Sequence, residues 1–262
     1  MTARSARRTV PVAVVALGVA VGLVGLVGYA VLGLGHPDAD GAADPAYGTA
    51  SPPGVPAAEA ATRVVPGPSR SEDRPLVDAG WVARTATAAG IPAPAVRAYA
   101  DAELVVRQER PSCHLSWNTL AGIGWVESQH GTVGGRTLGA EGRSSQPILG
   151  PALDGSDGFA ALHSTPTSQA WHGDPVWDHA VGPLQFLSST WGRWGADADG
   201  DGVADPNDLD DAALAAGRYL CADGHDLATD AGWNAAVHSY NHDAWYVASV
   251  AAAANTYVAR TR

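Results

Sequence analysis

The feature that most limits what this chain can fold into is an uncharged, apolar run over residues 9–35. The run is about 27 residues long and rich in Val, Leu, Ala and Gly, which is enough to span a bilayer as a tilted helix. Arg4, Arg7 and Arg8 precede it, and a positively charged flank stays in the cytoplasm. We therefore expect a cytoplasmic tail over residues 1–8, a single-pass transmembrane anchor over residues 9–35, and a C-terminal domain outside the cytoplasm.

A cleaved signal peptide, which would give a secreted protein, is the alternative to the anchor. The run is much longer than the usual apolar segment of a signal peptide, and no clear Ala-x-Ala site closes it. Gly28-Tyr29-Ala30 nevertheless leaves room for cleavage. We favour the uncleaved anchor in the cytoplasmic membrane, and the mass of the mature protein distinguishes the two forms.

After the apolar run, the composition indicates two further regions, a linker and a domain. Residues 36–74 are dense in Pro, Ala, Gly, Ser and Asp without an apolar period, so we expect a disordered linker. Fully extended, this linker would reach on the order of 100 Å, although a spacer of no particular length fits the composition equally well. Residues 75–262 then form one domain of ordinary size. A core of that size needs no partner chain for stability, so we expect a monomer.

Within residues 75–262, apolar residues recur with the helical period, and no convincing alternation predicts strands. We therefore expect a mainly α fold. A first apolar segment starts near residue 75, and the helices after it are expected over residues 94–108, 116–131, 183–194, 209–222, 233–240 and 244–257. Residues 132–178 are rich in Gly, Ser and Pro, and a loop of this length is typical of a lid or a binding wall.

The charge of the chain excludes one class of partner. The formal net charge is −11 and the sequence contains no Lys, so no basic stripe is available to neutralise phosphate groups. We expect no nucleic-acid partner.

One acidic residue falls where the helical pattern predicts burial. In the helix expected over residues 116–131, the face that carries Leu120 and Ile123 also carries Glu127, in the last turn. Apolar neighbours would raise the pKa of this carboxyl group and make it a general acid near neutral pH. The alternative is a solvated or ion-paired Glu on the surface.

An Asp-rich stretch over residues 197–208 follows the pattern of an EF-hand calcium loop. Carboxylates stand at positions 1, 3, 5 and 9, Gly202 at position 6 and a backbone carbonyl at position 7. The expected ligands are Asp197, Asp199, Asp201, Val203, Asp205 and Asp208. Asp208 occupies position 12, where the pattern requires the longer Glu, so we expect a weak, structural calcium site. An acidic turn without metal is the alternative.

The chain has two cysteines, Cys113 and Cys221. In a domain outside the cytoplasm we expect them to form a disulfide, which would close a loop of about 108 residues and stabilise the fold by up to about 4 to 5 kcal/mol. Two buried free thiols are the alternative.

Two short motifs follow Glu127-Ser128 along the chain. Gly182-Pro183-Leu184-Gln185-Phe186 places a Gly-Pro turn and a polar Gln among apolar residues, and Tyr240-Asn241 ends a helix. In this order on a helical, exported chain, the motifs resemble those of the lytic transglycosylases of the lysozyme-like superfamily. The Asp-rich loop is similar to that of the membrane-bound type B branch. The resemblance covers about residues 117–257, and Leu184 departs from it where many relatives have Met.

The resemblance implies a lysozyme-like enzyme that cleaves the glycan strands of peptidoglycan. Glu127 matches the single catalytic acid/base, which protonates the oxygen between N-acetylmuramic acid and N-acetylglucosamine and then takes the proton of the muramoyl 6-hydroxyl, giving a 1,6-anhydro product. Tyr240 is expected to orient Glu127 and to contact the sugar, and Asn241 to hold local structure. The implied substrate-binding residues are Ser128, Gln185, Tyr240 and Asn241.

The sequence leaves two other functions open. A hydrolytic muramidase would use the same Glu127 but release reducing ends. A non-catalytic peptidoglycan-binding module would bind the sugar and form no product, and the presence of Glu127 together with Ser128, Gln185 and Tyr240 argues against it.

Overall fold

The computed structural model describes residues 76–156 and 160–262. Within these two ranges the chain forms eight α-helices, three short 3-10 turns and only isolated β-bridges, so the expectation of a mainly helical fold is confirmed. The predicted tail, anchor and linker lie outside the described residues. None of the described helices is long and apolar enough to cross a membrane.

The helices follow the expected segments to within a few residues at their ends, with two larger differences. Their bounds are α2 Ala79–Ala89, α3 Ala93–Glu109, α4 Trp117–Ser128, α5 Pro166–His172, α6 Ser188–Trp194, α7 Leu209–Leu220, α8 Asp230–Tyr240 and α9 Ala244–Thr261. The helix expected over residues 183–194 begins only at Ser188, because residues 182–185 form a tight turn between Val181 and Phe186. The short helix α5 was not predicted, and it lies in the segment expected to be a loop.

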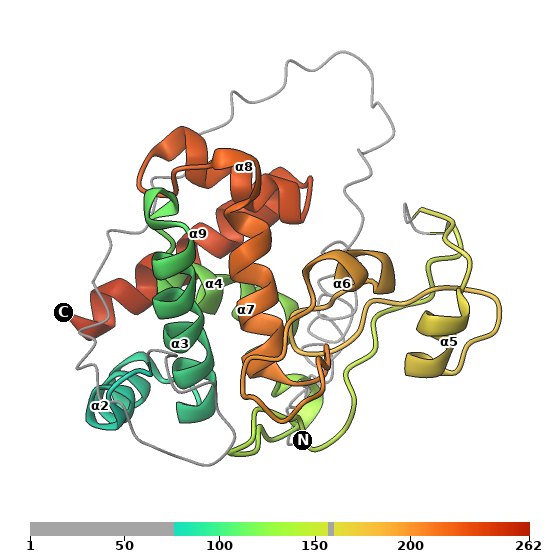
Figure 1. The fold of residues 1–262 in the computed structure, drawn as a ribbon, viewed down its shortest axis with the longest axis horizontal. Coiled ribbons are helices and arrows are strands. Elements are labelled where there is room, and N and C mark those ends of the chain that lie inside the picture. Colours follow the sequence, from blue (N-terminus) through green and yellow to red (C-terminus); the bar gives the residue numbers. More distant parts are fainter. Residues whose placement is uncertain (1–75, 157–159) are drawn as a thin grey trace, which may run out of the picture.

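Helix α4 lies inside the helical bundle (Figure 1). It packs mainly against α9 and also against α3, while α3 packs along α7. Every residue of α4 except Trp125 is buried, so the helix is covered on all sides. The sequence pattern predicts burial of one face only. A helix that is apolar around its whole circumference belongs in the interior of a domain. The central position of α4 fixes the surroundings of Glu127.

Two glycines allow the neighbouring elements to approach α4 this closely. A Cβ atom at Gly122 would lie 2.7 Å from the carbonyl oxygen of Val250 in α9, and one at Gly124 would lie 2.0 Å from the hydroxyl of Tyr99 in α3. Both distances are too short for a carbon atom, so any larger residue would push these helices away from α4. The glycines therefore help to set the position of the last turn of α4.

The expected disulfide between Cys113 and Cys221 is confirmed, with Cα atoms 5.5 Å apart. It joins the turn Pro111–Cys113, which precedes α4, to the residue that follows α7. The backbone N–H of Leu227 also donates to the carbonyl of Cys113, so the covalent link lies beside a hydrogen-bonded contact. The bond holds the start of α4 against the end of α7.

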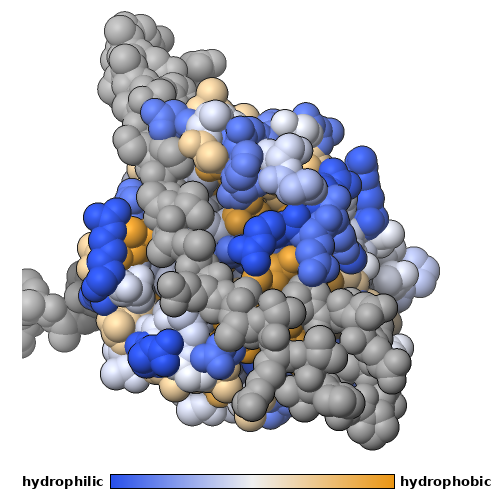
Figure 2. Space-filling view, turned by 60° about the vertical axis from the view of Figure 1, so that its left-hand side comes forward, coloured by the Kyte–Doolittle hydropathy of each residue, from blue (hydrophilic) through white to orange (hydrophobic). Residues whose placement is uncertain are grey.

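The face of the molecule drawn in Figure 2 shows little continuous apolar area. On the face drawn in Figure 2, the hydrophobic surface that is not overlaid by grey atoms is broken into small areas between hydrophilic residues. The large hydrophobic side chains exposed in the described part of the chain are Trp125, Leu149, Val176, Val203 and Trp245. Helix α5 lies at one end of the molecule, away from α2, α3 and α4 (Figure 1).

Candidate active site

Glu127 lies in the last turn of α4 and is only 1% exposed. One of its carboxyl oxygens, Oε1, accepts a hydrogen bond of 2.7 Å from the hydroxyl of Tyr246, in the first turn of α9. The other oxygen, Oε2, is buried and has no hydrogen-bond partner among the described residues. A buried polar atom without a partner is rare in folded proteins and often marks a site where a ligand binds.

Burial changes the protonation of this carboxyl group. Loss of solvation raises the pKa of Glu127 to about 8, and the hydrogen bond from Tyr246 lowers it by a smaller amount. Glu127 is therefore mainly protonated at neutral pH. Because Oε1 accepts from Tyr246, the acidic proton lies on Oε2, the oxygen that the protein leaves free.

The end of α4 is held by a buried histidine. The ring of His130 lies between two tyrosine hydroxyls, that of Tyr99 at 3.2 Å from Nδ1 and that of Tyr257 at 2.9 Å from Nε2. Burial lowers the pKa of His130 to about 3, so the ring is neutral. The backbone at Gln129 and His130 is left-handed, with φ of 53° and 60°, which ends the helix directly after the catalytic candidate.

Tyr240 supports the site in a different way from the one expected. Its hydroxyl donates to the carbonyl of Leu184 at 2.8 Å, and its ring stacks on that of Tyr246 with an interplanar angle of 6°. The hydroxyl that hydrogen-bonds Glu127 belongs to Tyr246, whereas the sequence had suggested Tyr240 for this role. Burial raises the pKa of both tyrosines well above the ordinary value, so both remain neutral.

The turn over residues 182–185 is joined to the end of α4 by Ser128. The hydroxyl of Ser128 donates to the carbonyl of Pro183 at 2.6 Å and accepts from the backbone N–H of Gly131 at 2.8 Å. Both hydrogen-bonding functions of this hydroxyl are therefore used within the protein. Ser128 was predicted to bind substrate, and in the structure it connects Glu127 to the turn.

Gln185 presents a second oxygen without a partner. Its Nε2 donates to the carbonyl of Gly182 at 2.8 Å, while its Oε1 is buried without a hydrogen-bond partner in the described part of the chain. The backbone of Gln185 is left-handed, with φ of 52°, a conformation that costs energy for a residue other than Gly and is typical of functional sites. Glu127 and Gln185 thus each hold one free oxygen, on two segments that Ser128 ties together.

Asn241 lies at the end of α8 and is buried. Its Oδ1 accepts from the backbone N–H of Asp243, and Asp243 in turn caps α9 by accepting from the N–H groups of Trp245 and Tyr246. These bonds fix the start of α9, which carries the hydroxyl bound to Glu127. The structure therefore gives Asn241 contacts that hold the local backbone, and its contact with substrate stays a prediction.

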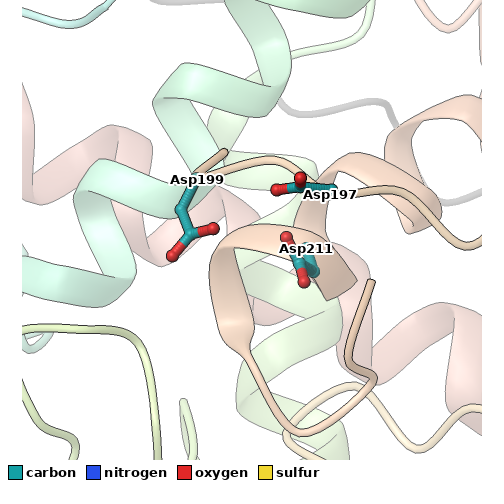
Figure 3. Close-up of side chains that lie close together, drawn as sticks. All are labelled: Asp197, Asp199 and Asp211. Atoms are coloured by element: carbon teal, nitrogen blue, oxygen red, sulfur yellow. The ribbon is translucent and has the colours of Figure 1, made fainter. Parts of the chain in front are cut away.

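The Asp-rich loop brings together a set of carboxylates that differs from the predicted one. Ligand atoms of Asp197, Asp199 and Asp211 lie within 4.8 Å of one another. Figure 3 shows Asp211 on its helix below Asp197, with Asp199 at the side. Asp211 also closes the loop, because its two oxygens accept from the backbone N–H groups of Ala198 and Asp205. Burial raises the pKa of Asp211 to about 6.

Asp208, the predicted ligand at position 12, lies at the N-terminal end of α7. Its Oδ1 accepts from the N–H of Asp210 and so caps the start of α7, and its Oδ2 lies 3.5 Å from Nε of Arg143. Burial raises the pKa of Asp208 to about 7. Arg143 also forms an ion pair with Asp205, so a single guanidinium group lies beside two of the expected ligands.

The carboxylate cluster does not include the other predicted carboxylate ligands. Asp201 accepts from the N–H of Val203, whose side chain is exposed. Of the six predicted ligands, Asp197 and Asp199 are the two in the cluster, and Asp211 completes it. Carboxylate oxygens are the type of ligand that hard divalent cations take.

A close contact links the loop to the turn beside Glu127. A Cβ atom at Gly182 would lie 1.9 Å from the carbonyl oxygen of Pro206, and the φ of Gly182 is 79°, so this position requires Gly. The Asp-rich loop and the turn over residues 182–185 therefore pack against each other. The conformation of the Asp-rich loop is expected to influence the position of Gln185.

Comparison of the chain with known proteins gives no match to a family model, to a curated protein or to a solved structure. The chemistry of the site therefore has to be argued from its own geometry.

That geometry suits general acid/base catalysis. Glu127 holds a proton at neutral pH on an oxygen that the protein does not use, and Gln185 offers an acceptor within the same group of elements. A buried carboxylic acid of this kind can donate its proton to a leaving group and later accept one. Tyr246 was missed by the sequence analysis, because only the packing of α9 on α4 brings it to Glu127.

Proposed function

We propose that the protein is a peptidoglycan lytic transglycosylase with a lysozyme-like helical domain. The observation that carries the proposal is the buried carboxyl group of Glu127, which is protonated at neutral pH, is held through Oε1 by Tyr246 and has a free Oε2. The order of the three motifs along the chain supports the same assignment. The substrate would be the bond between N-acetylmuramic acid and N-acetylglucosamine in a glycan strand.

In this proposal, Oε2 of Glu127 gives its proton to the glycosidic oxygen as the bond to the muramoyl carbon breaks. The resulting carboxylate then accepts the proton of the muramoyl 6-hydroxyl, whose oxygen bonds to the same carbon and closes the 1,6-anhydro ring. The proton balance is complete without water, so one carboxyl group is enough. Tyr246 stabilises the carboxylate that forms between the two steps. Oε1 of Gln185 accepts a hydrogen bond from a donor group of the sugar.

Two further parts of the proposal concern the cation and the location. We propose that Asp197, Asp199 and Asp211 hold a structural calcium ion, which would relieve the repulsion among these carboxylates. The apolar run over residues 9–35 would anchor the protein in the cytoplasmic membrane, with the domain outside and facing the peptidoglycan.

The experiment that tests the proposed function is digestion of purified peptidoglycan by the full-length protein, followed by mass spectrometry. Wild type is expected to release 1,6-anhydromuramoyl fragments, and Glu127→Gln is expected to release none while keeping its helical content. Reducing-end fragments from wild type would indicate the hydrolytic muramidase instead. Binding to peptidoglycan without any fragment would indicate the non-catalytic module.

A further inference from the structure

A row of aromatic rings runs from Glu127 to helix α6. Tyr246, which hydrogen-bonds Glu127, stacks on Tyr240 with ring centroids 6.5 Å apart. Tyr240 in turn meets Tyr219 of α7 edge to face at 5.5 Å, and Tyr219 meets Trp194 of α6 in the same way at 6.0 Å. The row therefore joins the candidate acid to the end of α6 through direct ring contacts.

The outer part of this row reaches the surface. Tyr246 is buried, whereas the other three rings, those of Tyr240, Tyr219 and Trp194, are half-buried. The hydroxyl of Tyr219 donates to the carbonyl of Ser239, which fixes the orientation of this ring. A line of partly exposed rings therefore begins beside the candidate site and ends on α6.

Arg193 lies at the outer end of the row. Its guanidinium carbon is 5.0 Å from the centroid of the Trp194 ring, over the ring face, and its side chain is exposed. The face of an indole attracts a cation. A stacked guanidinium group keeps its planar fork of N–H donors, which matches the two oxygens of a carboxylate. The indole therefore holds Arg193 in place and leaves the fork available.

Arg193 has no acidic partner within the described residues. The arginines that pair with carboxylates there are Arg97, Arg107, Arg143 and Arg218. In a chain with a formal net charge of −11, an exposed arginine that is held but not paired can bind an anion from outside the molecule. Helix α6 begins at Ser188, shortly after Gln185, so this cation follows the turn that holds one of the two free oxygens of the site.

We propose that Arg193, held on Trp194, is a specificity residue that binds a carboxylate of the muramoyl residues, either on the lactyl group or on the peptide attached to it. The inference rests on the proposed function, because it places the glycan strand along the aromatic row from Glu127. The hydroxyl and acetamido groups of the sugars are neutral, so the carboxylates of the substrate are the groups that a guanidinium selects. Cleavage is therefore faster on a strand that carries them.

The first measurement is kcat/KM of the full-length protein in detergent, on purified peptidoglycan and on the same material with its carboxyl groups converted to amides. Wild type is expected to prefer the carboxylate form about fivefold, as for an exposed but well-aligned ion pair. Arg193→Gln should lose this preference and keep the wild-type kcat/KM on the amide form. Arg193→Lys, which keeps the charge without the fork, should retain part of the preference. A full preference in Arg193→Gln would overturn the proposal.

Two further variants separate position from charge. Arg84→Gln removes an exposed arginine from α2, which lies on the other side of α3 and α7 from α6 (Figure 1), and should keep the wild-type preference. Trp194→Leu keeps the charge of Arg193 but removes the ring beneath it, so the preference should fall while circular dichroism shows unchanged helical content. An equal loss in Arg84→Gln and Arg193→Gln would show a general effect of charge and refute the site.

Binding separates this inference from the proposed function. Full-length Glu127→Gln in detergent is sedimented with native peptidoglycan, with the amidated form, and with strands from which an amidase has removed the peptides and left the lactyl carboxylate. Binding should be weaker to the amidated form, and added salt should reduce the difference. Native-like binding to the amidase-treated strands assigns the lactyl group, and amidated-like binding assigns the peptide.

The two proposals fail in different ways. If wild type releases no fragments but binding still distinguishes native from amidated peptidoglycan, and Arg193→Gln abolishes the difference, the proposed function is refuted and the carboxylate site stands. Equal binding to the native and amidated forms would refute the carboxylate site, whatever the activity.

Discussion

The hydroxyl of Tyr246 donates to Oε1 of Glu127 at 2.7 Å, although 119 residues separate the two in the sequence. The bond selects Oε1 as the acceptor, so the proton of Glu127 lies on Oε2, and it also stabilises the carboxylate that forms when this proton leaves. One hydroxyl therefore determines which oxygen carries the proton and partly offsets the effect of burial on the pKa of Glu127.

Removal of that hydroxyl in Tyr246→Phe is expected to raise the pKa of Glu127 further, because the hydrogen bond is the interaction that lowers it. The alkaline limb of the kcat/KM profile assigned to Glu127 should move to higher pH, and kcat should fall about tenfold or more through loss of a buried, charge-assisted bond. Tyr240→Phe, which removes the bond to Leu184, is the control and should leave the position of this limb unchanged. A limb that stays in place in Tyr246→Phe would contradict the role given to this hydroxyl.

The buried Glu127 is also expected to make the stability of the domain depend on pH. Its pKa is about 8 in the folded protein against an ordinary value of 4.5, so the folded state binds more protons between these values. Stability therefore falls as the pH rises through this range, by up to about 4 to 5 kcal/mol from this group.

Urea unfolding of wild type and Glu127→Gln checks this pH dependence. The neutral amide of the variant cannot ionise, so its stability relative to wild type should increase steadily from about pH 4.5 to about pH 8. A difference between the two proteins that does not change with pH would show that Glu127 is not a buried, protonated acid.

The helices were predictable from the sequence, because their apolar residues recur with a period that depends only on local geometry. Helix α5 could also have been found, since Thr165 caps it, Pro166 is its first residue and Gly173 follows it in the left-handed conformation. The pair Gly182-Pro183 signals a turn, but the left-handed backbone of Gln185 leaves no local signal, so the sequence predicts a helix from residue 183 onward.

The candidate site was predictable only in part. The spacing of Leu120, Ile123 and Glu127 indicates that the acid is buried, but contacts between distant helices determine which tyrosine reaches it. In the Asp-rich loop, counting twelve positions from Asp197 predicts Asp208 as the last ligand. In the structure Asp208 lies just before α7, and the carboxylate that joins Asp197 and Asp199 is that of Asp211, in the first turn of α7.

Gly150→Ala should leave the fold intact and reduce activity. The added Cβ atom would lie 2.8 Å from Oε1 of Gln185, which is the end of a flexible side chain, so the amide moves and the backbone does not. We expect kcat/KM to approach that of Gln185→Ala, with helical content unchanged by circular dichroism. Gly192→Ala, in helix α6, is a control for the loss of a glycine, because no atom lies within 4 Å of an added Cβ there and its backbone is not left-handed. Wild-type kcat/KM in Gly150→Ala would show that the segment around Gly150 does not position Gln185.

Calcium is expected to raise the melting temperature of wild type, because a ligand that binds only the folded state stabilises it. Asp211→Asn should abolish the increase, since it removes one of the three clustered carboxylates. Asp201→Asn, outside the cluster, should retain it. Thermal melts with added calcium or chelator provide the measurement. Equal increases in Asp211→Asn and wild type would exclude Asp211 as a ligand.

The central claim is that Glu127 cleaves the glycan by internal ring closure without water. Digestion of peptidoglycan in water labelled with heavy oxygen, by wild type and by Glu127→Gln, tests it most directly. The account predicts unlabelled 1,6-anhydromuramoyl ends from wild type and no products from the variant. Heavy oxygen at the new muramoyl end, or substantial turnover by Glu127→Gln, would contradict it.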